Sequence, residues 1–323
     1  MKPPVFEIEP PDLGPWRTGN TGTAGVWRFT ATAPGRHVLL TALIHGNELC
    51  GAWALRDLLA TGVRPRRGTL SLAFANLDAF DRFDPGDPHA SRYVHTDMNR
   101  LWGELPWRRD VPAQGVEHRR VLELLPHVEA SDWLLDLHSM HEPGPPLALV
   151  GPLPHQAEQA RALGLSALCV ADQGHRAGVR MRDHGRYGNP MATDAFALLL
   201  ECGYHGAQSA VDVARDALAR FLVHAGTLDR SDLPTSWWQE EITDATPLLD
   251  VTHAVTVAPG AAPRFAAPWR CGEVVEQAGT LIGWSGDEPV LTPYDRCWLV
   301  MPSLAHAVPG ATLVRFARER AAP

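Results

Sequence analysis

The sequence predicts an α/β protein with a mainly parallel (mixed) sheet and helices on both faces, followed by a small C-terminal all-β domain. Up to residue 224, apolar runs of strand length alternate with segments of helical periodicity, an alternation typical of βαβ units. After residue 250 no convincing helical pattern follows, and short apolar runs are separated by Gly and Pro turns. Together these patterns indicate one large α/β unit with a smaller β-rich companion.

The elements are expected in a regular order along the chain. Residues 25–44 are interpreted as two strands joined at a Pro-Gly turn, the second a continuous apolar run typical of a buried strand. A helix is predicted from Glu48 to about Ala60, where apolar residues recur at helical spacing. A loop is expected at 81–91. Further strands are predicted at 69–75, 133–139, 166–170 and 195–203, and further helices at 114–129 and 208–224.

A polar, proline-containing stretch at 226–250 indicates a domain boundary. We expect residues 1–240 to form the α/β domain and residues 241–323 to form the β-rich domain. Strands of the second domain are expected within CGEVVE, TLIGW, PVLT, CWLVM and ATLVRFA.

Charge and cysteine content narrow the classes of partner and compartment. The net charge of -8 over 323 residues disfavours nucleic acid and anionic membranes, which need a basic face, and favours a small-molecule ligand. The five cysteines are far apart and form no C-x-x-C pair, which favours a reducing, cytoplasmic location. The N-terminal residues lack the apolar stretch of a secretory signal, and no apolar run is long enough to span a bilayer.

The segment TALIHGNELCG contains the strongest local signal for chemistry. His45 ends a predicted buried strand, and Glu48 opens the helix that follows. His138 ends the strand at 133–139. Because ligands of open α/β sheets bind at the carboxyl ends of strands, these three side chains are candidate zinc ligands, with a fourth position left for water. A chance match of H-x-x-E, with His138 as an ordinary hydrogen-bonded histidine, is the alternative.

Further candidates follow from charged groups beside apolar runs. Glu201 would be costly to bury as an unpaired structural carboxylate, so it is a candidate general base and acid, although a helix-terminal or surface carboxylate is the alternative. Arg92, Asn99 and Arg100 lie in a turn-rich stretch and could bind carboxylates or an oxyanion, or simply be solvated. Asp136 could orient His138, or only pack. Cys202 is expected to be buried and inert.

These motifs, taken by order and spacing, resemble the succinylglutamate desuccinylase and aspartoacylase family within the broader zinc carboxypeptidase fold. IHGNE, TDMNRLW, LLDLHS and LLLECG carry the resemblance, over about residues 37–205. The resemblance implies one Zn²⁺ per chain on His45, Glu48 and His138, with the β-rich domain capping the active site. Of the family's catalytic and substrate-binding groups, it implies Glu201 as general acid/base, Arg92 on the scissile carbonyl, and Asn99 with Arg100 on the substrate carboxylate. The family also uses an arginine and a tyrosine to bind the acidic side chain of the substrate. The candidates for that arginine are Arg180, Arg182 and Arg186, and the candidate for that tyrosine is Tyr294.

The function expected from the resemblance is cleavage of the amide bond of a small acidic or N-acylated amino acid. Two alternatives stay open: a zinc carboxypeptidase acting on peptides, which would need an open cleft, and a non-catalytic zinc-binding interaction module. The acyl group, the amino acid and the formation of a homo-oligomer are left open by the sequence.

Overall fold

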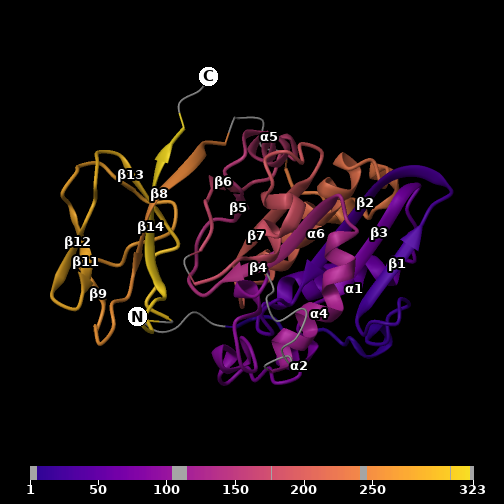
Figure 1. Cartoon of the computed structure of the whole chain (residues 1–323), viewed down its shortest axis with the longest axis horizontal. Helices are drawn as coiled ribbons and strands as arrows, with labels where there is room; N and C mark the ends of the chain where they lie inside the picture. Colours follow the sequence, from indigo (N-terminus) through magenta and orange to yellow (C-terminus); the bar gives the residue numbers. More distant parts are fainter. Residues whose placement is uncertain (1–5, 104–114, 176, 241–245, 306, 321–323) are drawn as a thin grey trace.

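The computed structural model describes residues 6–103, 115–175, 177–240, 246–305 and 307–320 (Figure 1). The strands up to residue 204 are β1 (Val26–Thr30), β2 (Ala33–Ala42), β3 (Arg67–Phe74), β4 (Trp133–Met140), β5 (Leu147–Val150), β6 (Leu168–Ala171) and β7 (Phe196–Tyr204). The α-helices are α1 (Leu49–Thr61), α2 (Leu77–Phe80), α4 (Val116–Glu129), α5 (Pro154–Ala162) and α6 (Gln208–His224). The later strands are β8 (Leu248–Thr256), β9 (Arg264–Phe265), β10 (Val274–Val275), β11 (Leu281–Ser285), β12 (Glu288–Leu291), β13 (Cys297–Val300) and β14 (Thr312–Glu319).

Within the described residues, one mixed sheet of 11 strands runs in the order β1-β3-β2-β4-β7-β5-β6-β8-β14-β13-β10. The central pairs β3–β2, β2–β4 and β4–β7 are parallel, and α1 forms the crossover between β2 and β3. β1 pairs antiparallel to β3, whereas β5 pairs antiparallel to β7 and parallel to β6. The predicted α/β class, with a mainly parallel sheet, is confirmed.

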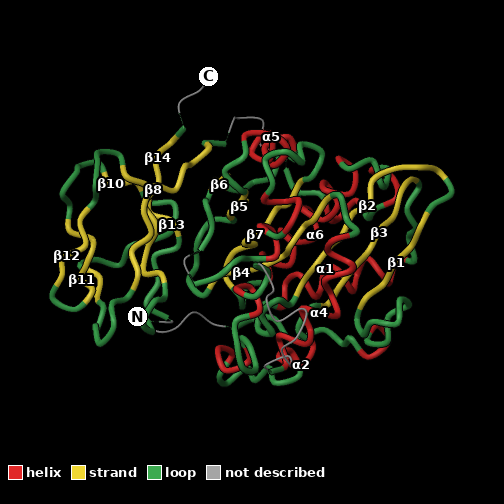
Figure 2. The backbone as a smooth tube through the Cα atoms, viewed as in Figure 1, coloured by secondary structure: helices red, strands yellow, loops and turns green. Residues whose placement is uncertain are grey.

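Helices cover both faces of the sheet. Successive side chains of a strand point to opposite faces, so the continuous apolar runs of the buried strands need cover on both sides. On one face Leu40 and Leu135 pack in the same core cluster as Leu55 of α1. On the other face Leu39 and Leu134 pack with residues of α4. Figure 2 shows the helices grouped around the central strands, with the C-terminal strands beside them.

The C-terminal strands extend the main sheet as well as forming a sheet of their own. β8 pairs parallel to β6, and β14 pairs antiparallel to β8. β12, β11 and β9 form a separate antiparallel sheet. The boundary predicted between residues 240 and 241 falls at the edge of 241–245, which lies outside the described residues, and it stays a prediction. Among the helices described here, none has the length and apolarity needed to cross a membrane.

The chain differs from the predicted elements at three places. Pro34 and Gly35 lie inside β2 rather than in a turn, and β1 pairs with β3 instead of β2. A Cβ at Gly35 would lie 2.8 Å from the nitrogen of Gly68, so this glycine allows a close backbone approach where the β2–β3 register shifts. β5 and α5 were not predicted, because a strand of four residues between prolines has too short an apolar run.

Candidate active site

The candidate site lies where three neighbouring parallel strands end. β2, β4 and β7 are adjacent in the sheet, and His138 of β4 stands in register beside Glu201 of β7. His45 follows β2 by three residues. Because parallel strands end at a common edge, side chains that are 156 residues apart in the sequence, from His45 to Glu201, meet there.

The turn between β2 and α1 is tightly enclosed. Leu43 has φ of 61°, a left-handed conformation that costs about 1 kcal/mol or more for a residue with a Cβ. A Cβ at Gly46 would lie 2.4 Å from the carbonyl carbon of Ala79 and 2.5 Å from the oxygen of Ser91, so glycine is required. Glu48 occupies the N-cap of α1 but makes no capping hydrogen bond. Its carboxylate points to the two histidines instead.

Two imidazoles converge on that one carboxylate. The Nδ1 atom of His45 lies 2.7 Å from Glu48 Oε1, and Nδ1 of His138 lies 2.8 Å from Glu48 Oε2. The other ring nitrogens are held by Asp97, 2.9 Å from His45 Nε2, and by Asp136, 2.8 Å from His138 Nε2. When each Nε2–H donates to an aspartate, each Nδ1 presents a lone pair, which is how zinc-binding histidines are oriented.

This donor set fits a zinc ion. One ligand atom from each of His45, Glu48 and His138 lies within 4.8 Å of the other two, and all three residues are buried. Zinc bonds of about 2 Å to nitrogen and oxygen suit such a triangle. Burial alone would raise the pKa of Glu48, but the adjacent imidazoles lower it well below its usual range. The carboxylate therefore stays ionised, as a metal ligand must.

Glu201 faces the same space without taking part in that triangle. It is only 8 % exposed, and its Oε2 has no hydrogen-bond partner among the described residues. Burial, together with the nearby charge of Glu48, raises the pKa of Glu201 to about 8, against the opposing effects of His138 and Arg92. A carboxyl whose pKa lies near neutrality can both accept and donate a proton.

The segment SRYVHTDMNR (91–100) supplies two arginines and an asparagine at the edge of the site. The Arg92 guanidinium lies 3.4 Å from both Glu48 Oε1 and Asp97 Oδ2, and Arg100 lies 3.7 Å from the same Asp97 carboxylate. The buried Asn99 accepts a hydrogen bond at its side-chain oxygen from the nitrogen of Met181. Asp97 thus contacts His45 and both arginines. Burial alone would raise the pKa of Asp97, but His45, Arg92 and Arg100 lower it well below its usual range.

One pocket of about 120 Å³ contains the site. It is lined by the three candidate metal ligands, by Glu201 and by four arginines, Arg92, Arg100, Arg180 and Arg315. A neighbouring cleft of about 470 Å³ shares several of its lining residues, among them Arg92 and Arg315. Met301 and Arg315 of the C-terminal part line both spaces. Residues of the C-terminal part therefore contribute to the walls of both spaces.

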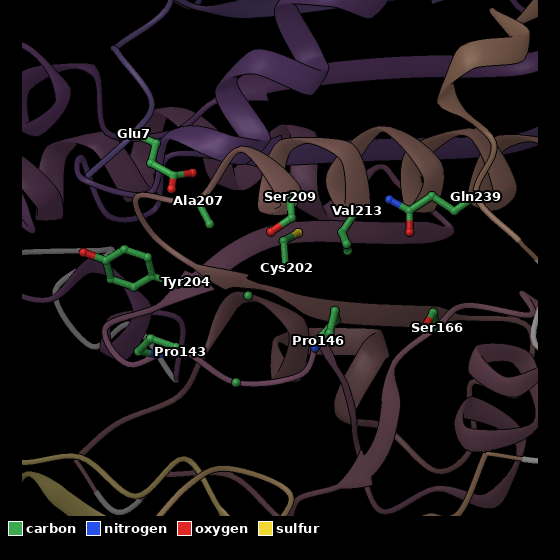
Figure 3. Close-up of a pocket in the computed structure, with 12 residues that line it drawn as sticks. Glu7, Pro143, Pro146, Ser166, Cys202, Tyr204, Ala207, Ser209, Val213 and Gln239 are labelled. Carbon is green, nitrogen blue, oxygen red and sulfur yellow. The ribbon is translucent and has the colours of Figure 1, made fainter. Parts of the chain in front are cut away.

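A second pocket, of about 460 Å³, lies on the other face of β7 (Figure 3). Cys202 lines it, since consecutive strand residues point to opposite faces and Glu201 lines the first pocket. Glu7 is the one charged residue among those that line it. Burial raises the pKa of the Cys202 thiol well above its usual range, so Cys202 is not an activated nucleophile.

The structure brings some of the remaining sequence candidates to the pocket and not others. Arg180 lines it, whereas Arg182 is fully buried behind it and donates to the oxygen of Asp172. Arg186 is paired with Asp132, which precedes β4 and so lies at the opposite edge of the sheet. Tyr294 bonds to Thr252 and carries Arg318 over its ring; it does not line the pocket.

Four residues at the site escaped sequence reasoning. Asp97 had a signal, because it lies within TDMNR two residues before Asn99. His141 and His175 lie in irregular segments, and Arg315 is one of the alternating residues of a late strand, so none of these three had a local signal. Burial and the cations Arg100, Arg315 and Arg180 lower the pKa of His175 to about 4.

Comparisons with known proteins agree with this fold. The sequence model of the succinylglutamate desuccinylase/aspartoacylase catalytic domain matches residues 34–224. Similar solved structures include a succinylglutamate desuccinylase/aspartoacylase from Rhodobacter sphaeroides (19 % identity, 92 % of this chain and 89 % of that one, TM-score 0.64). Others are a succinylglutamate desuccinylase from Chromobacterium violaceum (21 %, 93 % and 90 %, 0.64) and the ectoine utilization protein EutE (DoeB) from Ruegeria pomeroyi (19 %, 90 % and 87 %, 0.58). A search of curated protein sequences found no match.

Proposed function

Because the chain belongs to the succinylglutamate desuccinylase/aspartoacylase family, we propose that it is a zinc-dependent hydrolase that cleaves the amide bond of a small N-acyl amino acid. The observation that carries the proposal is the pairing of a buried His-Glu-His triangle with a buried, partly unpartnered Glu201 in one pocket. In a purely structural zinc site the protein ligands complete the coordination, and no additional acidic side chain is needed. This supports catalysis over a non-catalytic interaction module.

One zinc ion per chain would be held by His45, Glu48 and His138. Such an ion supplies Lewis-acid polarisation of a carbonyl and a lowered pKa of water. Glu201 would take a proton from the attacking water and deliver it to the leaving nitrogen, for which its raised pKa is suited. Arg92 would donate hydrogen bonds to the oxygen on which negative charge develops.

The charges of the pocket favour an acidic substrate, because four arginines line it against two carboxyl residues, Glu48 and Glu201. Arg92 and Arg100 share Asp97, Arg180 and Arg315 share Asp172, and Arg180 also pairs with Asp183. The Nη2 atom of Arg180 is buried and has no partner among the described residues. We propose that Asn99 and Arg100 hold the free carboxylate of the amino acid, while Arg180 and Arg315 interact with a second acidic group.

A peptide substrate is less compatible with the pocket. The pocket that contains Glu201 is about 120 Å³, and Met301 and Arg315 line it. A carboxypeptidase needs room for the peptide chain on the acyl side of the scissile bond, and a pocket of this volume offers little. We further propose a cytoplasmic location, because all five cysteines are unpaired.

The proposal is tested by zinc content and by hydrolysis of a panel of N-acetyl, N-succinyl and N-formyl amino acids, with short peptides alongside. We expect one zinc per chain and turnover of at least one acidic N-acyl amino acid. Glu201→Gln should keep its zinc and lose at least about 10²-fold in kcat, whereas His45→Ala should lose both zinc and activity. Glu288→Gln, on an exposed edge of β12, is the matched control and should behave as wild type.

Three results would contradict the proposal. An active Glu201→Gln variant would mean that another group moves the proton. A zinc-loaded wild-type protein that hydrolyses none of the panel would favour the interaction module, and release of C-terminal residues from peptides would favour the carboxypeptidase.

A further inference from the structure

A hydrogen-bonded chain of three side chains leads from the strand that carries His138 to Arg92. The Oγ atom of Ser139 lies 2.7 Å from Nδ1 of His205. The Nε2 atom of His205 lies 3.2 Å from Nδ1 of His141. The Nε2 atom of His141 lies 3.4 Å from Nη1 of Arg92. None of these contacts is used in the proposed metal site or proton transfer.

The anchor of this chain is buried and uncharged. His205 is 2 % exposed, and its backbone nitrogen donates to the oxygen of Met140, which fixes the loop after β7 to β4. Burial lowers the pKa of His205 to about 3, and the nearby Arg92 and His45 act in the same direction against Glu48. A neutral imidazole has one donor and one acceptor, so the direction of every bond in the chain can be worked out.

The direction is set from the arginine end. A guanidinium group only donates, so Nε2 of His141 must accept from Arg92, and a neutral His141 then carries its proton on Nδ1. That Nδ1–H donates to Nε2 of His205. His205 therefore carries its own proton on Nδ1 and donates it to Ser139 Oγ. One proton arrangement satisfies all three contacts, with both histidines as Nδ1–H tautomers.

We propose that His141 is a positioning residue for Arg92, held in place by His205 and Ser139; the proposal rests on the proposed function, in which Arg92 stabilises the developing oxyanion. Arg92 already contacts the carboxylates of Glu48 and Asp97 at 3.4 Å, which attract its charge toward the metal ligands. A neutral acceptor on Nη1 fixes the orientation of the guanidinium without neutralising it. A carboxylate in the place of His141 would fix it equally well but would weaken its interaction with an oxyanion.

The first test separates positioning from substrate binding. We expect His141→Leu to keep its zinc and to lower kcat at least about 10-fold, since small misplacements of a catalytic group are costly, with KM within about threefold of wild type. His141→Gln, whose amide oxygen can accept from Arg92, should recover most of the lost kcat. His205→Leu should lower kcat in the same way, because it removes the anchor without touching Arg92. His253→Leu, at an exposed position of β8, is the control for a histidine replaced by leucine.

The second test does not depend on activity. Long-range ¹⁵N–¹H NMR of the zinc-loaded protein, with signals assigned through the His141→Gln and His205→Gln variants, reports the tautomer of each ring. We expect Nδ1–H for both His141 and His205, the opposite of the Nε2–H form that prevails for exposed histidine. An Nε2–H form at His141 would overturn the proposal, whether or not a substrate has been found.

The kinetic outcomes also separate the two proposals. An inactive wild-type protein contradicts the proposed function and leaves the NMR result to decide whether the chain of contacts exists. An active wild type with unchanged kcat in His141→Leu contradicts the positioning role alone. A change confined to KM would assign His141 to substrate binding and would also overturn the positioning role.

Discussion

Asp172 is the carboxylate on which the arginines beside the pocket depend, and replacing it gives a measurable prediction. Arg180 lies 3.0 Å and Arg315 lies 3.6 Å from its Oδ2 atom, and Asp172 itself is 4 % exposed. Burial would raise its pKa, but Arg180, Arg315 and Arg182 lower it from 3.8 to about 2. At roughly 1.4 kcal/mol per pKa unit, this difference contributes about 2.5 kcal/mol to stability at neutral pH.

The sign and the pH range follow from linkage. The folded protein holds the Asp172 carboxylate at a lower pKa than the unfolded chain, so the unfolded chain binds more protons in acid. The stabilisation is complete above about pH 4 and is lost as the pH falls through about 2. At pH 3 roughly half of it should remain.

Urea unfolding of wild type and Asp172→Asn, followed by tryptophan fluorescence with EDTA present to exclude metal linkage, tests this reasoning. We expect Asp172→Asn to be less stable by at least about 2 kcal/mol at pH 7, and the difference to fall by about half at pH 3. Asp287→Asn, at an exposed turn, is the control and should change little at either pH. A difference as large at pH 3 as at pH 7 would show that packing rather than charge is lost.

Three further predictions concern the pocket itself. Gly46→Ala should lower zinc content and the midpoint of thermal unfolding, because its Cβ would overlap backbone atoms at 2.4 to 2.5 Å; normal zinc content would contradict the close approach. Asp136→Asn should weaken zinc binding about 10- to 100-fold in competition with a chelator, and unchanged affinity would mean that Asp136 only packs. Arg315→Met should raise KM at least about 10-fold for a substrate with a second acidic group and little for a neutral one; an equal change for both would exclude a specific contact.

Much of the fold and the centre of the candidate site could be predicted because their signals are local. His45, His138 and Glu201 each follow an apolar run, and the rule that parallel strands end at one edge converts three separate motifs into one site. The sequence does not state which strands are neighbours. The rule still led to one site because β2, β4 and β7 are adjacent in the sheet.

The residues that surround that centre could not be predicted in the same way. Arg180, Arg182 and Arg186 look alike in the sequence. The structure separates them, since Arg180 binds the Asp172 carboxylate and lines the pocket, Arg182 donates to the backbone oxygen of Asp172, and Arg186 binds Asp132. Arg315 reaches the pocket through strand pairing with β8, a contact between distant segments. β5 and α5 were missed because short elements carry weak periodicity.

The order of the strands has a geometric consequence for the pocket. β7, which carries Glu201, and β14, which carries Arg315, are four steps apart in the sheet, or roughly 19 Å if the sheet were flat. Both residues nevertheless line the same small space. A twist of roughly 20–25° per step accumulates to about a right angle over that distance, so β14 runs across the direction of β7. The span between the reacting groups and Arg315 is thus set by how many strands intervene and how strongly each one turns.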